Sequence, residues 1–283
     1  MVKAIQQARA AFAMLSPDEI HNRAIRPVSF GLVADSEQAF AEMEDFLIPA
    51  GASPAVRAGL RGLVYRAGDP DAPEKVDLVL YQDGAEGPKG TYTFHRDEPG
   101  RTAAEIVRAN DDIAPAMARA YPAFRVPVVE RVIHSIAREN ALFAIATALP
   151  DLIPSLIELP WALGEFASDT AFLTANQIRM AFQIAAACGR PVGFAHQKAE
   201  VLGIAAGAFG WRAIARELAG KIPFGGGLIP KGAIAYAVTY GIGKGLERLY
   251  HAGAPLTKAE RREIYRQAYE RGASVTETIA PAR

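Results

Sequence analysis

The stretch "RPVSFGLVADSEQAFAEMEDFLIP", from Arg26 to Pro49, changes its hydrophobic period half-way and thereby decides the fold class. Val28–Ala34 is an apolar run of strand-forming residues, which predicts a short strand. Asp35 and Gln38 have capping-box spacing, and the apolar residues after them recur at helical intervals. The sequence therefore predicts a strand–turn–helix unit here.

Two later segments extend this unit into a small sheet. Strand-forming residues predict a second strand at Lys75–Gly84 and a third at Thr91–Pro99. The segment Ser53–Ala67 has a helical pattern and lies between the first and second strands. The N-terminal part of the chain is thus expected to alternate strands and helices.

The pattern becomes helical from Thr102, which forms a capping-box pair with Glu105 and opens a long series of predicted helices. We therefore predict an α+β fold with two parts. A small N-terminal α/β unit is expected over residues 1–100, followed by a larger, closely packed all-helical domain over residues 101–283.

The bulk composition excludes several classes of protein. The 283 residues carry 31 basic and 31 acidic side chains, so no net charge directs the chain toward nucleic acid. A lone cysteine, Cys188, excludes an intramolecular disulfide framework and fits a reducing compartment. The first residues lack the apolar core of a secretory signal, so a cytoplasmic location is expected.

The block from residue 141 to residue 246 is unusually poor in charge, with 14 charged residues. Its longest uncharged stretches have only 11 or 12 residues, whereas a transmembrane helix needs about 20. We therefore expect a buried helical core, or re-entrant or interfacial segments, in preference to membrane spans.

The first strand–turn–helix invites comparison with a P-loop, but its residues do not suit phosphate. The segment "GLVADSEQAF" has one glycine and no lysine, and Asp35 and Glu37 occupy the helix end where a phosphate would bind. A capped structural unit is expected, which is compatible with a degenerate nucleotide fold that has lost its ligand. No cofactor is predicted.

Glycines recur in "GIAAGAFG" and "GIGKG" at a spacing of four residues. Gly203 with Gly207, and Gly241 with Gly245, have the small-x-x-x-small pattern that lets helix backbones approach closely. The alternative, a phosphate cradle around Lys244, lacks a preceding strand and a following Ser or Thr. We predict close helix packing at these four glycines.

Catalytic and metal-binding patterns are missing from the sequence. His196 and Glu200 lie four residues apart, but no third ligand accompanies them. Cys188 lies in an apolar helical segment without a recognisable nucleophile motif. We predict no catalytic, cofactor-binding or metal-binding residues, which favours a protein that is not an enzyme.

Charge is distributed unevenly inside the block of low charge. Acids predominate before residue 171, whereas bases predominate after it, including Arg212, Arg216 and Lys221 beside Trp211. These three bases are candidates for contact with an anionic membrane surface or an acidic partner protein. The alternative is that they neutralise acids such as Glu158 or Glu165 inside the helical domain.

The same block resembles a bacterial family, the YcjF-like domain of unknown function, over about residues 141–252. The resemblance rests on four segments: "PDLIPSL" (Pro150–Leu156), "NQIRMAFQIAAACG" (Asn176–Gly189), "GAFGWRAIARELAGKIPFGGG" (Gly207–Gly227) and "AIAYAVTYGIGKGLERLY" (Ala233–Tyr250). Members occur in inner-membrane proteins and attached to Era-like GTPases. The resemblance implies proximity to the inner membrane and to a GTPase, and it carries over no catalytic residues.

Together these observations predict a non-enzymatic helical module that acts at the inner membrane or beside a partner GTPase. The lack of a P-loop argues against GTPase activity of its own. The alternative is an enzyme or small-ligand-binding protein with a site between the two parts. An oligomer stays open, and no nucleic-acid partner is expected.

Overall fold

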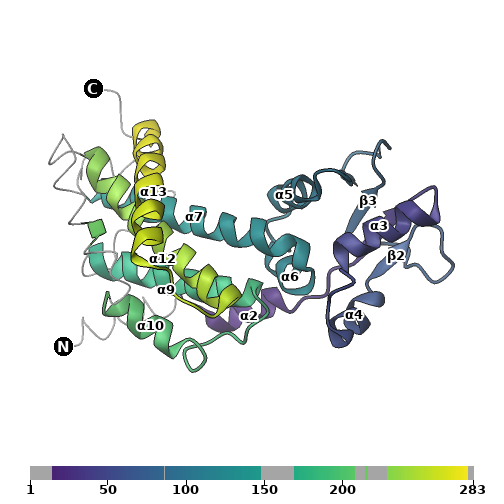
Figure 1. Cartoon of the computed structure of the whole chain (residues 1–283), viewed down its shortest axis with the longest axis horizontal. Coiled ribbons are helices and arrows are strands. Elements are labelled where there is room, and N and C mark those ends of the chain that lie inside the picture. Colours follow the sequence, from purple (N-terminus) through teal and green to yellow (C-terminus); the bar gives the residue numbers. More distant parts are fainter. Residues whose placement is uncertain (1–14, 86, 148–168, 208–213, 216–227, 280–283) are drawn as a thin grey trace. The chain divides into compact units, whose positions relative to one another are not determined.

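The computed structural model describes residues 15–85, 87–147, 169–207, 214–215 and 228–279 (Figure 1). It combines a small parallel sheet with a larger number of helices, which confirms the predicted α+β class. The chain forms two compact units. One contains Glu19–Glu130 with Ala186–Pro191, and the other contains the remaining residues.

The sheet of the α/β unit has four parallel strands in the order β2-β1-β3-β4. Its strands are β1 (Phe30–Val33), β2 (Val64–Arg66), β3 (Leu78–Tyr81) and β4 (Tyr92–Thr93). Phe30 lies opposite Val64 on one side and Leu78 on the other, so β1 is flanked by both neighbours. The strands predicted around β1, β3 and β4 are therefore present.

Strand β2 corrects the helix predicted at Ser53–Ala67. Helix α4 covers Pro54–Arg61, with the Ser53 side chain as its N-cap, and ends at Gly62. The next residues, Val64–Arg66, pair with β1 because that strand offers an open edge and because valine and tyrosine favour strands. A tertiary contact thus overrides the helical pattern.

The cap of helix α3 (Glu37–Leu47) also differs from the prediction. The Ser36 side chain is the N-cap and accepts a 3.2 Å hydrogen bond from the backbone N–H of Ala39. Asp35 therefore lies before the helix cap instead of forming it. The backbone N–H of Asp35 is used elsewhere, in a contact that belongs to the candidate site.

Three further helical segments follow the sheet in the chain and belong to the same unit. They are α5 (Pro99–Ala109), α6 (Ala114–Ala120) and the 3₁₀ turn η1 (Pro122–Phe124). Helix α2 (Pro17–Ala24) comes before the sheet in the chain. Phe30 on β1 packs edge-on against Tyr121 at 5.0 Å and stacks with Phe124 at 5.6 Å, measured between ring centroids. The Tyr121 hydroxyl donates a 2.6 Å hydrogen bond to the Val28 carbonyl.

These aromatic contacts explain where the units divide. The boundary lies at residue 130, inside helix α7 (Arg125–Ala146), and not at residue 100 as predicted. Residues 101–130 look helical by period, but Tyr121 and Phe124 are fully buried in the core of the sheet unit. The apolar contacts of this segment, and not its secondary structure, assign it to that unit.

The helical unit contains the rest of α7 with α9 (Asp169–Ala187), α10 (Lys198–Ala205), α12 (Leu228–Ala252) and α13 (Lys258–Ile279). Helices α12 and α13 lie side by side (Figure 1). Helix α12 also shares buried polar contacts with α7 and α9. Asn140 on α7 donates a 2.8 Å hydrogen bond to Thr239 on α12 and accepts a 2.9 Å hydrogen bond from Asn176 on α9. Such paired amides suit only one alignment of the three helices.

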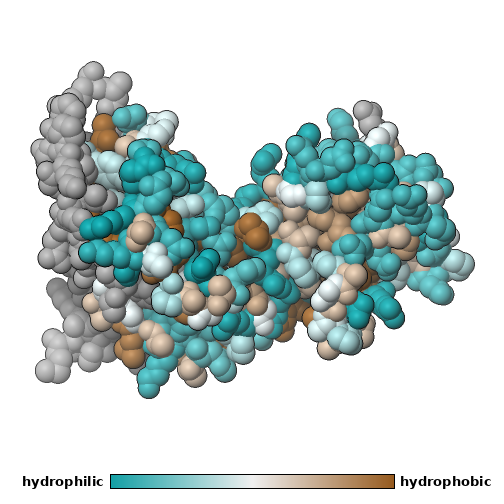
Figure 2. All heavy atoms as spheres, viewed as in Figure 1, coloured by the Kyte–Doolittle hydropathy of each residue, from teal (hydrophilic) through white to brown (hydrophobic). Residues whose placement is uncertain are grey.

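The surface of the described residues is mixed in polarity. Figure 2 shows predominantly hydrophilic side chains on the viewed face, with apolar ones between them. The most exposed large hydrophobic side chains come from five separate segments: Ile25, Val56, Val126, Leu202 and Ile229. None of the helices within the described ranges is long and apolar enough to span a membrane.

Candidate ligand pocket

A pocket of about 420 Å³ opens at the carboxyl ends of strands β1 and β3. These strands are neighbours, yet the chain leaves β1 for β2 on one side and reaches β3 on the other. The strand order therefore reverses between them. In open parallel sheets, ligands bind in the crevice beyond the strand ends at such a reversal.

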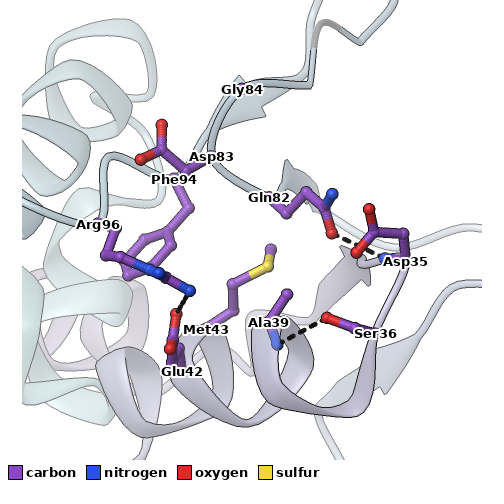
Figure 3. Close-up of a pocket in the computed structure, with 10 residues that line it drawn as sticks. All are labelled: Asp35, Ser36, Ala39, Glu42, Met43, Gln82, Asp83, Gly84, Phe94 and Arg96. Atoms are coloured by element: carbon purple, nitrogen blue, oxygen red, sulfur yellow. Dashed lines mark hydrogen bonds and ion pairs between the residues drawn. The ribbon is translucent and has the colours of Figure 1, made fainter.

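The lining of the pocket comes from three separate segments of the α/β unit (Figure 3). The β1–α3 turn and α3 supply Asp35, Ser36, Ala39, Glu42 and Met43; the turn after β3 supplies Gln82, Asp83 and Gly84; and Phe94 and Arg96 follow β4. The parallel register brings these segments together, because the carboxyl ends of all four strands meet at one edge.

One side of the pocket is formed by Asp35 and Gln82. The backbone N–H of Asp35 donates a 2.7 Å hydrogen bond to Oε1 of Gln82, and Figure 3 shows the Asp35 carboxylate beside this contact. The residue before Gln82, Tyr81, is aligned with Val33 in the ladder. The side-chain contact thus continues the pairing of β1 and β3 past the strand ends.

The opposite side of the pocket holds an ion pair. The Arg96 guanidinium contacts the Glu42 carboxylate. Both side chains lie on the side of the pocket opposite Asp35 (Figure 3). Glu37, in the first turn of α3, is also paired, with Arg66 on β2. The Arg66 guanidinium also lies 5.4 Å from the centre of the Phe40 ring, and this cation–π contact helps to fix its position.

The lining has an excess of negative charge. Asp35, Glu42 and Asp83 are acidic, and Arg96 is the basic residue that lines the pocket. Within the part of the chain that the structure describes, Glu42 has Arg96 as its partner, whereas Asp35 and Asp83 form no ion pair. Two exposed carboxylates therefore contribute uncompensated charge to the pocket.

The floor of the pocket is apolar. Met43 is fully buried and lies in the centre of the view in Figure 3, with Ala39 beside it on the same helix. Phe94 is only 6% exposed and packs against Phe46 with ring centroids 5.3 Å apart. The pocket thus combines a packed apolar base with polar groups at its rim, as small-molecule sites do.

A second polar cluster lies next to the lining residues in sequence. His95 Nε2 is 3.2 Å from Oε2 of Glu105, and Arg101 donates a 2.9 Å hydrogen bond to the same carboxylate. The hydrogen bond from Arg101 lowers the pKa of Glu105, with a smaller contribution from His95. Neither His95 nor Glu105 lines the pocket, and their contact joins the segment after β4 to α5.

The glycines predicted to pack closely occupy different kinds of position. Gly203 lies in α10 and Gly241 in α12. Gly207 follows the end of α10 with φ of +66°, a conformation that favours glycine and ends the helix. A Cβ on Gly245 would lie 4.0 Å from Leu256, an ordinary contact, so Gly245 is not a place of close approach.

Close approach between helices is recorded at Gly232, Gly243 and Gly272. A Cβ on Gly243 would lie 2.7 Å from Ile133 on α7, and one on Gly272 would lie 2.8 Å from the Tyr236 Cβ on α12. Spacing of four residues within one helix did not identify them, because the contact depends on which helix lies opposite.

The predicted contact residues Arg212, Arg216 and Lys221 lie outside the described residues, as do Glu158 and Glu165. Two other bases of the same block have partners elsewhere. Arg179 pairs with Glu139 on α7, and Lys244 pairs with Glu247 one turn along α12. Both pairs use acids other than Glu158 and Glu165.

The pocket carries no known sequence motif, so the sequence did not predict it. One usable signal was present: Asp35 directly follows the first predicted strand, and the polar pair Gln82 and Asp83 ends the apolar run of the second. In a parallel sheet these positions converge at one edge.

No group of three or more His, Cys, Asp or Glu side chains in the described ranges is placed to hold a metal ion.

No protein-family model, no curated protein and no solved structure matches the chain. The resemblance to YcjF-like domains therefore stays a prediction from the sequence.

Proposed function

We propose that the chain is a binding module whose α/β unit holds a small polar ligand in the pocket at the carboxyl ends of β1 and β3. The observation that carries this proposal is the position of the pocket at the point where the strand order reverses. The pocket lies wholly within residues 35–96, inside one unit, and not between the two parts of the chain.

The lining supports binding better than it supports a reaction. Ser36 already accepts a hydrogen bond from Ala39 as a helix cap, and Glu42 is paired with Arg96. The lining residues contain neither histidine nor cysteine, and no base contacts the Ser36 hydroxyl among the described residues. A nucleophile activated by a neighbouring base is therefore not formed here.

The test is to fill the pocket without changing its charge. Ala39→Leu places a larger apolar side chain on the half-buried face of α3 that lines the pocket. Ala41→Leu makes the same change two residues later, at an exposed position that does not line the pocket. A fragment screen by amide chemical shifts on the full chain should find ligands that perturb residues 35–39 and 82–84.

Binding of those fragments should be lost in Ala39→Leu and retained in Ala41→Leu, while both variants keep the wild-type melting temperature within about 2 °C. Fragments that perturb other surfaces only, or that bind Ala39→Leu as well as wild type, would contradict the proposal. The two leucine variants together separate loss of the pocket from a general effect of added apolar surface.

A second candidate function concerns the helical unit. We propose that it contacts the inner membrane, or a GTPase at that membrane, through Arg212, Arg216 and Lys221. The clustering of these bases in a block of low charge favours this candidate, and the resemblance to YcjF-like domains supports it. Each base near an anionic surface contributes about 1 kcal/mol, so replacing all three by Gln should weaken vesicle binding roughly a hundredfold.

The experiment is co-sedimentation with vesicles that contain phosphatidylserine, at moderate salt, together with thermal melts. The control is the triple change of Arg61, Lys75 and Lys89 to Gln, which removes equal charge from exposed positions of the α/β unit. If the three candidate bases instead neutralise buried acids, their loss should cost about 3–5 kcal/mol of stability and leave no vesicle binding to lose.

A further inference from the structure

We infer that the ligand of the pocket is an organic cation, a primary or secondary ammonium group attached to a short apolar body. This inference rests on the proposed function of the pocket and adds the chemical class of its ligand. The inference rests on the lining of one pocket, which combines two carboxylates without ion-pair partners among the described residues, Asp35 and Asp83, with the buried apolar side chains of Met43 and Phe94.

The charges of the lining favour a cation. The guanidinium of Arg96 is engaged by Glu42, so it neutralises an acid that also lines the pocket. The remaining negative charge belongs to Asp35, which lies beside Gln82, and to Asp83 at the rim, whose carboxylate points away from Met43 (Figure 3). An ammonium group that enters from solvent gains attraction from both carboxylates, whereas an anion is repelled by both.

The N-terminus of α3 does not reverse this preference. Its first turn contains Glu37, and its Ser36 cap already satisfies the Ala39 N–H. Asp35 precedes the cap, and its own N–H donates to Gln82. The backbone groups that would hold a phosphate are therefore partly used, and the nearby side chains are negative.

The apolar floor favours an organic cation over a metal ion. Divalent metals of the hard type require several oxygen ligands converging at about 2.0–2.6 Å. Within the described ranges, no group of three or more His, Cys, Asp or Glu side chains could supply them. Met43 and Phe94 have no oxygen ligands for a hydrated ion, but they can make van der Waals contact with a methylene chain or a ring.

The polar neutral groups complete the site. The Ser36 hydroxyl and the Gln82 amide lie on the same side as Asp35 and can exchange hydrogen bonds with an ammonium group or a neighbouring hydroxyl of the ligand. A pocket of about 420 Å³ falls in the size range of sites for small molecules.

The experiment compares three probes that share one body and differ in charge. Phenethylammonium, 2-phenylethanol and phenylacetate are titrated into the full chain, with MgCl₂ as a fourth probe, and binding is followed by the amide shifts of residues 35–39 and 82–84. Phenethylammonium should bind at least roughly fivefold more tightly than the alcohol, and phenylacetate more weakly still. Raising the salt concentration should reduce the preference.

The variants locate the charge effect. Asp35→Asn should weaken phenethylammonium roughly two- to fivefold and leave 2-phenylethanol unchanged, because an exposed charge contact contributes modestly. Asp83→Asn should act in the same direction. Asp97→Asn, an exposed acid one residue beyond Arg96 that does not line the pocket, is the matched control and should change nothing.

The outcomes separate this inference from the proposed function. If phenylacetate or 2-phenylethanol binds as tightly as phenethylammonium or more tightly, and Ala39→Leu abolishes this binding, the preference for a cation is wrong but the pocket is a binding site. Tighter binding of Mg²⁺ than of phenethylammonium at the same amides would replace the organic cation by a metal. If none of the four probes changes the amide shifts of residues 35–39 and 82–84 at millimolar concentration, both the inferred cation preference and the proposed binding pocket are wrong.

Discussion

The backbone N–H of Asp35 donates a 2.7 Å hydrogen bond to Oε1 of Gln82, which ties the ends of two neighbouring parallel strands together. This contact holds the turn between β1 and α3 against the turn after β3 at the place where the strand order reverses. Its consequence is an acidic opening, with the Asp35 carboxylate beside the contact (Figure 3).

Nucleotides should not bind at this opening. Asp35 and Glu37 flank the Ser36 cap where a phosphate would have to approach, so GTP and ATP with Mg²⁺ meet repulsion there. Isothermal calorimetry should show no heat of binding for either nucleotide at protein concentrations of about 100 μM. Micromolar binding that Ala39→Leu removes would contradict this account.

Asp77 should make the stability of the sheet unit depend on pH. Burial raises the pKa of Asp77, but hydrogen bonds from the Ser29 backbone N–H and hydroxyl, and then the charge of Arg26, outweigh it and hold the pKa below its ordinary value. A depressed pKa in the folded state means that the carboxylate stabilises the fold above the unfolded pKa of about 3.9. This contribution disappears as the pH falls through the folded pKa.

The matching experiment compares Asp77→Asn with wild type in urea melts from pH 7 to pH 2.5. At pH 7 the variant should lose about 1 kcal/mol, since the side chain is partly exposed and asparagine keeps one acceptor oxygen. The two curves should begin to converge as the pH falls below about 3.9, the unfolded pKa, and should meet below the depressed pKa of folded Asp77. Asp97→Asn should leave stability unchanged, and a constant difference across the whole range would refute the argument.

Two buried tyrosines should respond in opposite ways to loss of the hydroxyl. Tyr121→Phe removes the 2.6 Å hydrogen bond to the Val28 carbonyl and should cost about 1–2 kcal/mol. The Tyr265 hydroxyl has no hydrogen-bond partner among the described residues, and burial raises its pKa to about 12. Tyr265→Phe should therefore leave the free energy of unfolding unchanged or increase it by up to about 1 kcal/mol.

Both substitutions keep the ring, so packing is matched and the hydroxyl is the variable. Chemical denaturation gives the two free energies of unfolding. A larger loss for Tyr265→Phe than for Tyr121→Phe would show that the Tyr265 hydroxyl has a partner.

Glycine replacements should distinguish close helix contact from free space. In Gly272→Ala the new Cβ would lie 2.8 Å from the Tyr236 Cβ and 3.1 Å from the Ala233 backbone, so overpacking should cost about 1–3 kcal/mol. In Gly245→Ala the nearest atom, Leu256 Cδ1, is 4.0 Å away. That variant should gain up to about 1 kcal/mol from helix propensity.

Thermal melts of the two alanine variants provide the comparison, with circular dichroism to verify helical content. Equal melting temperatures would mean that α12 and α13 can separate at Gly272 at no cost, against the packing described above.

The sequence alone determined the elements whose signals are local. The change of period within Arg26–Pro49 placed β1 and α3, and the apolar runs before Gln82 and around Tyr92 placed β3 and β4. These features follow from side-chain alternation, helical spacing and turn chemistry, which act over a few residues. The α+β class follows from the same signals.

Only the tertiary structure decided which of these elements meet. Val64–Arg66 became a strand because β1 had an open edge, and residues 101–130 joined the sheet unit because Tyr121 and Phe124 pack on Phe30. The pocket has the same origin. Asp35, Gln82 and Arg96 are distant in sequence and meet through strand pairing, a long-range interaction that hydrophobic period does not encode.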